Sequence, residues 1–144
     1  MNRLRATALL LAILVLTEYV FGGLVSFDDP AELGLSLASH SLQWPEVLPF
    51  LHRLVATVLL IAWLFGLMIF YNTPVRKLAL ASVGLLVAQV AVGMAIPALR
   101  GRELVNYVII AHFSLSGLII VTTGLVFYLA WLAPPVPAGK AARA

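Results

Sequence analysis

Four long apolar segments, separated by short polar stretches, dominate the pattern of residues along this chain. They cover about 6–25, 49–71, 78–99 and 106–132, and each has the roughly 20 residues that a helix needs to cross a hydrocarbon core. The pattern therefore predicts an all-α fold, an integral membrane four-helix bundle built as a single domain over residues 1–133. Residues 134–144, rich in Pro, Ala and Gly, are predicted to form a disordered cytoplasmic tail.

The composition agrees with this pattern and narrows the classes of function. Of the 144 residues, 62% are hydrophobic and only 10% are charged, far from the average of a soluble globular protein. The nine Lys and Arg residues form no basic stripe, so no nucleic-acid partner is predicted. Cysteine is absent, which excludes disulfides, thiolate metal sites and cysteine nucleophiles.

The placement of the basic residues predicts the orientation of the helices. One side of the four-span arrangement carries Arg3, Arg5, Arg76, Lys77, Lys140 and Arg143, and the other carries Arg53, Arg100 and Arg102. By the positive-inside rule both termini are predicted to be cytoplasmic, in a multi-pass protein of the plasma membrane. The turns at 72–74 and 100–102 are short, so successive helices are expected to be antiparallel neighbours. Four aromatic residues are expected to form a belt at the cytoplasmic interface: Trp63, Tyr71, Tyr128 and Trp131.

Four polar side chains inside the predicted spans are candidate functional residues: Glu18, His52, Gln89 and His112. An ionisable side chain within a bilayer is costly unless it faces the bundle interior with a partner, which makes each a site candidate by default. Counted from the external helix ends at about 1.5 Å per residue, Glu18 and the two histidines lie roughly 5–10 Å deep. All three are therefore expected toward the external face.

A weak internal repeat groups these residues. Glu18 precedes Gly22 by four residues on the first helix, and Gln89 precedes Gly93 by four residues on the third. Each of these helices is followed by one with a histidine near its start, so the chain is predicted to be a pseudo-repeat of two helical hairpins. The glycines let a backbone or a flat ligand approach closely; plain helix packing is the alternative.

Two imidazoles facing each other across a bundle are typical axial ligands of a haem iron. We therefore predict that His52 and His112 bind haem iron. The alternatives are an interfacial histidine at position 52 and a helix–helix hydrogen bond at position 112. Their spacing excludes a HExxH zinc site. Four further residues are expected to contact the cofactor: Arg53, Gln89, Arg100 and Arg102. The three arginines are expected near its propionates; the alternative is that they serve only as interface anchors.

Several motifs resemble those of haem A synthase. FGGLV at 21–25 ends the first helix, QWP at 43–45 lies in the external loop, and HR at 52–53 opens the second helix. In the second half, Gln89 with Gly93, and AHF at 111–113, are similar to the corresponding positions of that family. Members usually have eight helices in two homologous halves, and this chain is similar to one half over nearly all its length. The resemblance indicates a compact, half-sized variant.

The resemblance implies an oxidoreductase that oxidises the C8 methyl group of haem O to the formyl group of haem A, which terminal haem-copper oxidases require. It implies haem b as cofactor, haem O as substrate, and a haem O synthase or a terminal oxidase as partner protein. Family members use one histidine pair for the cofactor and another for the substrate haem. Because this chain has one pair, we predict a homodimer in which two chains rebuild the eight-helix arrangement.

The chain also departs from the family pattern. The cysteine pair of the external loop is missing, and Pro49 stands where many members have a glutamate three residues before the histidine. Glu18 and Glu46 are the carboxylates expected to act in its place; the alternatives are a structural hydrogen bond for Glu18 and a solvated loop position for Glu46. Two other functions stay open: a membrane electron-transfer cytochrome with bis-histidine haem b, and a cofactor-free scaffold protein. The lack of a cytoplasmic-side histidine favours the enzyme.

Overall fold

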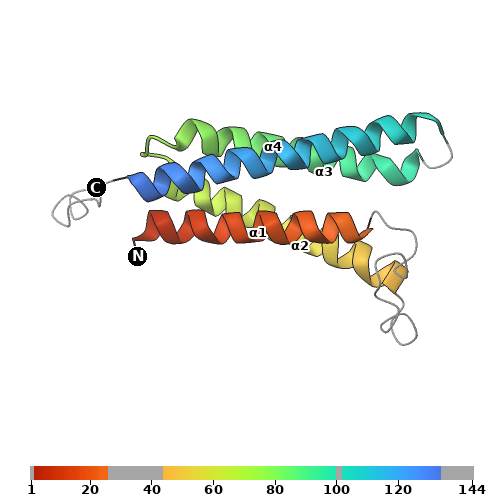
Figure 1. Ribbon diagram of the computed structural model, residues 1–144, viewed down its shortest axis with the longest axis horizontal. Helices are drawn as coiled ribbons and strands as arrows, with labels where there is room; N and C mark the ends of the chain where they lie inside the picture. Colours follow the sequence, from red (N-terminus) through yellow and green to blue (C-terminus); the bar gives the residue numbers. More distant parts are fainter. Residues whose placement is uncertain (1, 26–43, 100–101, 134–144) are drawn as a thin grey trace.

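The computed structural model describes residues 2–25, 44–99 and 102–133, without the side chains of residues 44–46. Within these ranges the chain is all-helical, with four helices in the order α1 (Arg3–Val25), α2 (Trp44–Phe70), α3 (Arg76–Ala98) and α4 (Leu104–Leu132). All four are long and apolar enough to cross a membrane. Figure 1 shows them side by side in one elongated bundle. The predicted all-α architecture of four helices long enough to span a membrane is confirmed for these residues.

The helices start earlier than hydropathy alone predicted. α1 begins at Arg3 instead of residue 6, α3 at Arg76 instead of 78, and α4 at Leu104 instead of 106. The largest difference is at α2, which begins at Trp44 instead of residue 49 and so includes Pro49. The apolar pattern marks the part of a helix in lipid, whereas backbone hydrogen bonding continues into the interface.

The four helices pack as two antiparallel hairpins. α1 packs against α2 and α3 against α4, and the hairpins meet through α1 with α4 and through α2 with α3. A tight turn between α2 and α3 is closed by the bond from Thr73 N to Phe70 O, 3.0 Å long. At the same end, Arg5 Nη2 donates to the carbonyl of Ala133 over 3.1 Å and so ties the start of α1 to the end of α4. α2 and α4, which carry the histidines, therefore lie diagonally across the bundle.

The fully buried residues are concentrated at one end of the bundle. The core cluster includes Trp63, Leu11 and Phe70, which are at most 1% exposed. Its members lie near the midpoints of the helices or toward the end of the bundle at which α1 begins. We call the other half the histidine half; it comprises residues 16–25, 47–58, 87–99 and 102–118. Among its described side chains only Leu48 is fully buried. The core thus seals one half of the bundle, and interior side chains of the other stay partly exposed.

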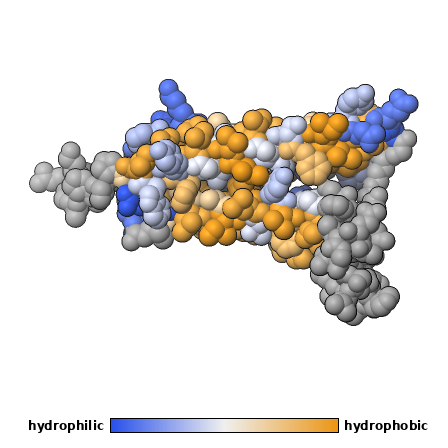
Figure 2. All heavy atoms as spheres, in the orientation of Figure 1, coloured by the Kyte–Doolittle hydropathy of each residue, from blue (hydrophilic) through white to orange (hydrophobic). Residues whose placement is uncertain are grey.

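The outer surface is suited to lipid. Figure 2 shows an apolar middle flanked by hydrophilic residues at both ends, as expected for a bundle that spans a bilayer. One residue of the expected aromatic belt lies elsewhere: Trp63 is 0% exposed and packs inside the core, so its assignment to the belt was wrong. The indole is too far along α2 from the helix end to reach the interface, and the core contacts hold it instead. Tyr71, Tyr128 and Trp131 are exposed near that end, as expected.

Candidate functional site

The two histidines lie together between the hairpins. His52 on α2 and His112 on α4 have ring centroids 6.3 Å apart, with the rings almost perpendicular at 80°. They are 60 positions apart in sequence and on diagonal helices, so only the packing of one hairpin on the other brings them together. Sequence analysis proposed this pair, and the structure places it in the histidine half of the bundle.

Each histidine is backed by the helix that precedes it. Nδ1 of His52 lies 2.9 Å from Oε1 of Glu18 on α1, and the two side chains are only 20% and 14% exposed. The contact has the length of an ion pair, and Nδ1 makes no hydrogen bond to a described residue. A Cβ added to Gly22, one turn after Glu18, would stand 3.3 Å from Cε1 of His52. The glycine therefore lets the imidazole lie directly against the α1 backbone.

His112 has a similar environment built from α3. Nε2 of Gln89 lies 3.3 Å from Nε2 of His112 and donates a short hydrogen bond to Oγ of Ser116. Ser116 in turn donates to the carbonyl of His112 over 3.1 Å. A Cβ added to Gly93 would stand 2.9 Å from Cε1 of His112, closer than ordinary Cβ contacts allow. The imidazole thus fills the space that a side chain at position 93 would need.

Ser116 was missed by sequence analysis, although a signal was present. It follows His112 by four residues and so lies on the same face of α4, one turn away. A serine in a membrane helix is commonly satisfied by a backbone carbonyl one turn earlier, as Ser114 and Ser116 both are, which hides its second contact from the sequence. Only the position of α3 reveals that Ser116 holds the Gln89 amide.

Several buried polar atoms at the site have no hydrogen-bond partner among the described residues. They are Oε2 of Glu18, Nδ1 of His52, Oε1 of Gln89 and Nδ1 of His112. A buried polar atom without a partner costs about 1–3 kcal/mol, and native structures contain few of them. Four such atoms around one histidine pair mark a place with hydrogen-bonding and coordinating capacity to spare, as a ligand-binding site requires.

The chain matches no family model, no curated protein and no solved structure.

The two imidazoles and the Glu18 carboxylate beside His52 are the donors that the described residues bring together for a metal. Among these residues, no group of three or more His, Cys, Asp or Glu side chains could hold an ion. A metal bound here would need its remaining ligands from another source, which a macrocycle such as a porphyrin supplies. With ring centroids 6.3 Å apart, the two imidazoles are close enough for both to hold one metal ion.

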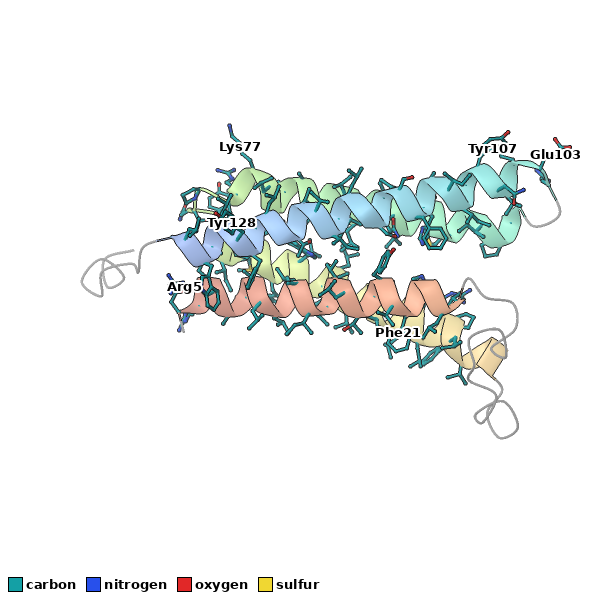
Figure 3. All side chains as sticks on the ribbon, in the orientation of Figure 1. Arg5, Phe21, Lys77, Glu103, Tyr107 and Tyr128 are labelled. Atoms are coloured by element: carbon teal, nitrogen blue, oxygen red, sulfur yellow. The ribbon has the colours of Figure 1, made fainter. Side chains whose placement is uncertain are left out.

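The other residues proposed for the site lie apart from the histidine pair or outside the described residues. Arg53 and Arg102 are exposed, and neither contacts the pair within the described part of the chain. Arg100 and the side chain of Glu46 lie outside the described residues. Figure 3 shows Phe21, Glu103 and Tyr107 at the same end of the bundle as the histidine half. The contacts expected between arginine and propionate, and the catalytic role of Glu46, stay predictions.

Proposed function

We propose that this protein is a membrane haem protein in which His52 and His112 are the two axial ligands of a haem b iron. The observation that carries the proposal is the pair itself: two imidazoles from opposite hairpins, 6.3 Å apart, in a bundle half without a sealed core. Bound haem would supply one-electron and oxygen chemistry, and the protein would supply orientation and a dry environment. The contact of His112 with Gln89 on α3 agrees with a structural role for His112, but it does not explain why His52 of the other hairpin lies beside it.

The residues behind each imidazole suit a ligand role. A metal-binding histidine usually donates a hydrogen bond from its second ring nitrogen to a carboxylate or carbonyl, which fixes the orientation of the ring. Glu18 occupies that place beside Nδ1 of His52, so Nε2, on the other side of the ring, is the nitrogen available to iron. On His112, Nδ1 has no hydrogen-bond partner among the described residues, and Nε2 lies beside Gln89, whose amide would stay bound to Ser116 if Nε2 held a metal instead. Glu18 thereby becomes a positioning residue as well as a candidate catalytic carboxylate.

The orientation in the membrane follows from charge. The end of the bundle at which α1 begins carries Arg3, Arg5, Arg76 and Lys77, and the acidic residues of the chain lie elsewhere in the sequence. With that end in the cytoplasm, the histidine pair lies toward the external face of the plasma membrane. Arg53 and Arg102, the described basic residues of the opposite end, are then the ones that would bind haem propionates.

We further propose that the reaction is that of haem A synthase, in which a haem O methyl group is oxidised to a formyl group for terminal oxidases. Support comes from the motifs shared with that family and from the site that they build: Gly22 and Gly93 each border a histidine, and Glu18 and Gln89 each contact one. These contacts also agree with a repeat of two hairpins. Haem O synthase or the terminal oxidase would be the neighbouring protein.

The decisive experiment supplies the expressed chain with haem O, followed by extraction of the haems and their identification by chromatography and pyridine spectra. Haem A is expected from the wild-type chain. A stable six-coordinate haem b without haem A would overturn the synthase, and a chain that binds no haem would overturn the haem protein as well.

An electron-transfer cytochrome is the second candidate, and the position of both histidines at one place in the bundle favours it. If both histidines bind one iron, that iron has no open coordination position for a substrate or oxygen, as in cytochromes that only carry electrons. The synthase therefore needs a second haem site. The histidine pair of the described residues provides one site per chain. A homodimer would supply it.

One face of α3 supports the homodimer. Small residues recur on it at intervals of three and four residues, opposite the buried positions Ala79, Ser82 and Leu86: Ala81, Gly84, Ala88, Ala91 and Ala95. A Cβ added to Gly84 would meet no atom within 4 Å. Small residues on a lipid-facing surface let a second helix approach closely, which is a common basis of association in membranes.

The dimer is tested by Gly84→Leu, which places a bulky side chain in the middle of this face. We expect the dissociation constant of the dimer in detergent or lipid to rise about ten-fold or more, since close backbone packing is lost. Gly124→Leu is the matched control, because Gly124 is also exposed and unobstructed but lies on α4. Single-molecule photobleaching in liposomes measures both. A wild-type monomer, or equal behaviour of the two variants, would contradict the proposal.

The role of Glu18 is tested by Glu18→Gln, which removes the charge beside His52 and keeps the shape. A carboxylate near an axial ligand favours the ferric state, so the midpoint potential of the bound haem is expected to rise, by roughly 50 mV or more. Spectroelectrochemical titration measures the change, and Glu103→Gln, exposed at the start of α4, is the control. An unchanged midpoint potential in Glu18→Gln would show that the contact between Glu18 and His52 does not influence the redox potential of the haem. Glu46→Gln, assayed separately for haem A, tests the other carboxylate.

A further inference from the structure

A groove at the end of the bundle opposite the histidine half contains the turn between α2 and α3. It has a volume of about 430 Å³ and is lined by six residues, which we call the Arg76 groove: Leu67, Met68, Tyr71, Asn72, Arg76 and Leu80. It belongs to no part of the haem site. Its wall combines apolar side chains deeper along the helices with polar ones at the turn.

The polar end of the groove carries a positioned cation. The guanidinium carbon of Arg76 lies 4.2 Å from the centre of the Tyr71 ring, a stacking contact that holds the side chain over the groove. Arg76 is also the first residue of α3, which begins without a side-chain cap. The positive end of the helix dipole therefore adds to the charge of the guanidinium. An arginine at such a point presents several donors to a phosphate group.

The apolar end of the groove is exposed where lipid chains would be. Met68 is 76% exposed and Leu80 is 49% exposed, on neighbouring helices. Leu80 follows Arg76 by four residues, so it lies about 6 Å further into the membrane along α3. A molecule that placed a phosphate at Arg76 would therefore extend its hydrocarbon chain over Leu80 and Met68.

The end of the bundle that holds the groove is basic among the described residues. All six acidic residues lie within 18–46 or at 103, outside the segments that line the groove. Four of the described basic residues lie at this end: Arg3, Arg5, Arg76 and Lys77; Figure 3 shows Arg5 and Lys77 here, remote from Glu103. A basic, apolar groove at a membrane interface is complementary to an anionic lipid.

We propose that the Arg76 groove binds one anionic phospholipid, with its phosphate on Arg76 and one acyl chain over Met68 and Leu80. The site is separate from the haem pair, so it stands or falls independently of the proposed enzymatic function. Because the lipid would contact α2 and α3 at their connection, it would also hold the two hairpins together at the end where the core is sealed.

Native mass spectrometry of the full chain tests the proposal, after release from vesicles of equal parts phosphatidylcholine and phosphatidylglycerol. The wild-type chain is expected to retain phosphatidylglycerol in preference to phosphatidylcholine. Arg76→Gln should lower this retention about five-fold, the contribution of one basic residue near an anionic surface. Arg76→Lys keeps the charge and should retain most of the lipid. Arg3→Gln removes a charge at the same end outside the groove and should change little.

Three results would overturn the proposal. Equal losses in Arg3→Gln and Arg76→Gln would show attraction to the leaflet without a site. Displacement of the lipid by soluble glycerol 3-phosphate would show a site for a free anion. The groove would be a contact between chains if the wild type retained no lipid and Arg76→Gln changed the oligomeric state in pure phosphatidylcholine. Thermal unfolding of each variant establishes that it is folded.

Discussion

His52→Ala and His112→Ala are each expected to abolish six-coordinate haem binding, because each removes one of the two imidazoles whose ring centroids lie 6.3 Å apart. We expect haem affinity to fall on the order of 100-fold or more, since even supporting residues of a metal site commonly contribute 10- to 100-fold. The measurement is titration of haem into the purified apoprotein, followed by the visible spectrum. The remaining haem in either variant should be five-coordinate, and haem A production should cease.

His40→Ala is the control for these variants, because the third histidine of the chain has no role in the proposed site. It is expected to bind haem as the wild type does. The contradicting result is a six-coordinate, bis-histidine spectrum that survives in either His52→Ala or His112→Ala. That outcome would place the iron ligands elsewhere and return the two histidines to structural roles.

Gly93→Ala is expected to weaken haem binding without destabilising the protein. The new Cβ would stand 2.9 Å from Cε1 of His112, so the imidazole must move away from its position opposite His52. The ring is the far end of a flexible side chain and can move at little cost, while alanine is favoured over glycine within a helix by about 1 kcal/mol. Stability should therefore stay level or rise, and haem affinity should fall about ten-fold.

Two further glycines calibrate this result. Gly22→Ala brings a Cβ to 3.3 Å from His52, a milder conflict that should cost less affinity. Gly124→Ala meets no atom within 4 Å and should leave haem binding unchanged. Haem titration gives the affinities, and thermal unfolding in detergent gives the stabilities. If Gly93→Ala binds haem as tightly as Gly124→Ala does, the close approach of α3 to His112 has no part in the site.

The contact of Glu18 with His52 changes how the carboxylates of this chain are ranked. Sequence analysis offered Glu18 and Glu46 as equivalent replacements for a missing family glutamate. In the structure Glu18 lies 2.9 Å from the imidazole, with its second oxygen unpartnered among the described residues. One oxygen can thus orient the ligand while the other stays available to a proton or a substrate. The potential and the haem A yield of Glu18→Gln separate these two roles.

The apolar pattern by itself determined the class of the protein. Four segments long enough to cross a bilayer leave little choice of fold, since lipid forces backbone polar groups into helices. The same physics singled out Glu18, His52, Gln89 and His112, because polar groups in a span are rare and costly. Pattern alone also misplaced the start of α2 and assigned Trp63 to the interface, since hydropathy does not record where helical hydrogen bonding begins or which face is covered.

Only the tertiary structure decided how the polar residues pair. That Glu18 contacts His52, that Gln89 bridges His112 to Ser116, and that the two rings meet between the hairpins depend on the rotation and crossing of whole helices. Nearly every residue of these helices is apolar, so hydropathy carries little information about which face turns inward. Close packing at Gly22 and Gly93 sets that rotation, and the distances of the site follow from it.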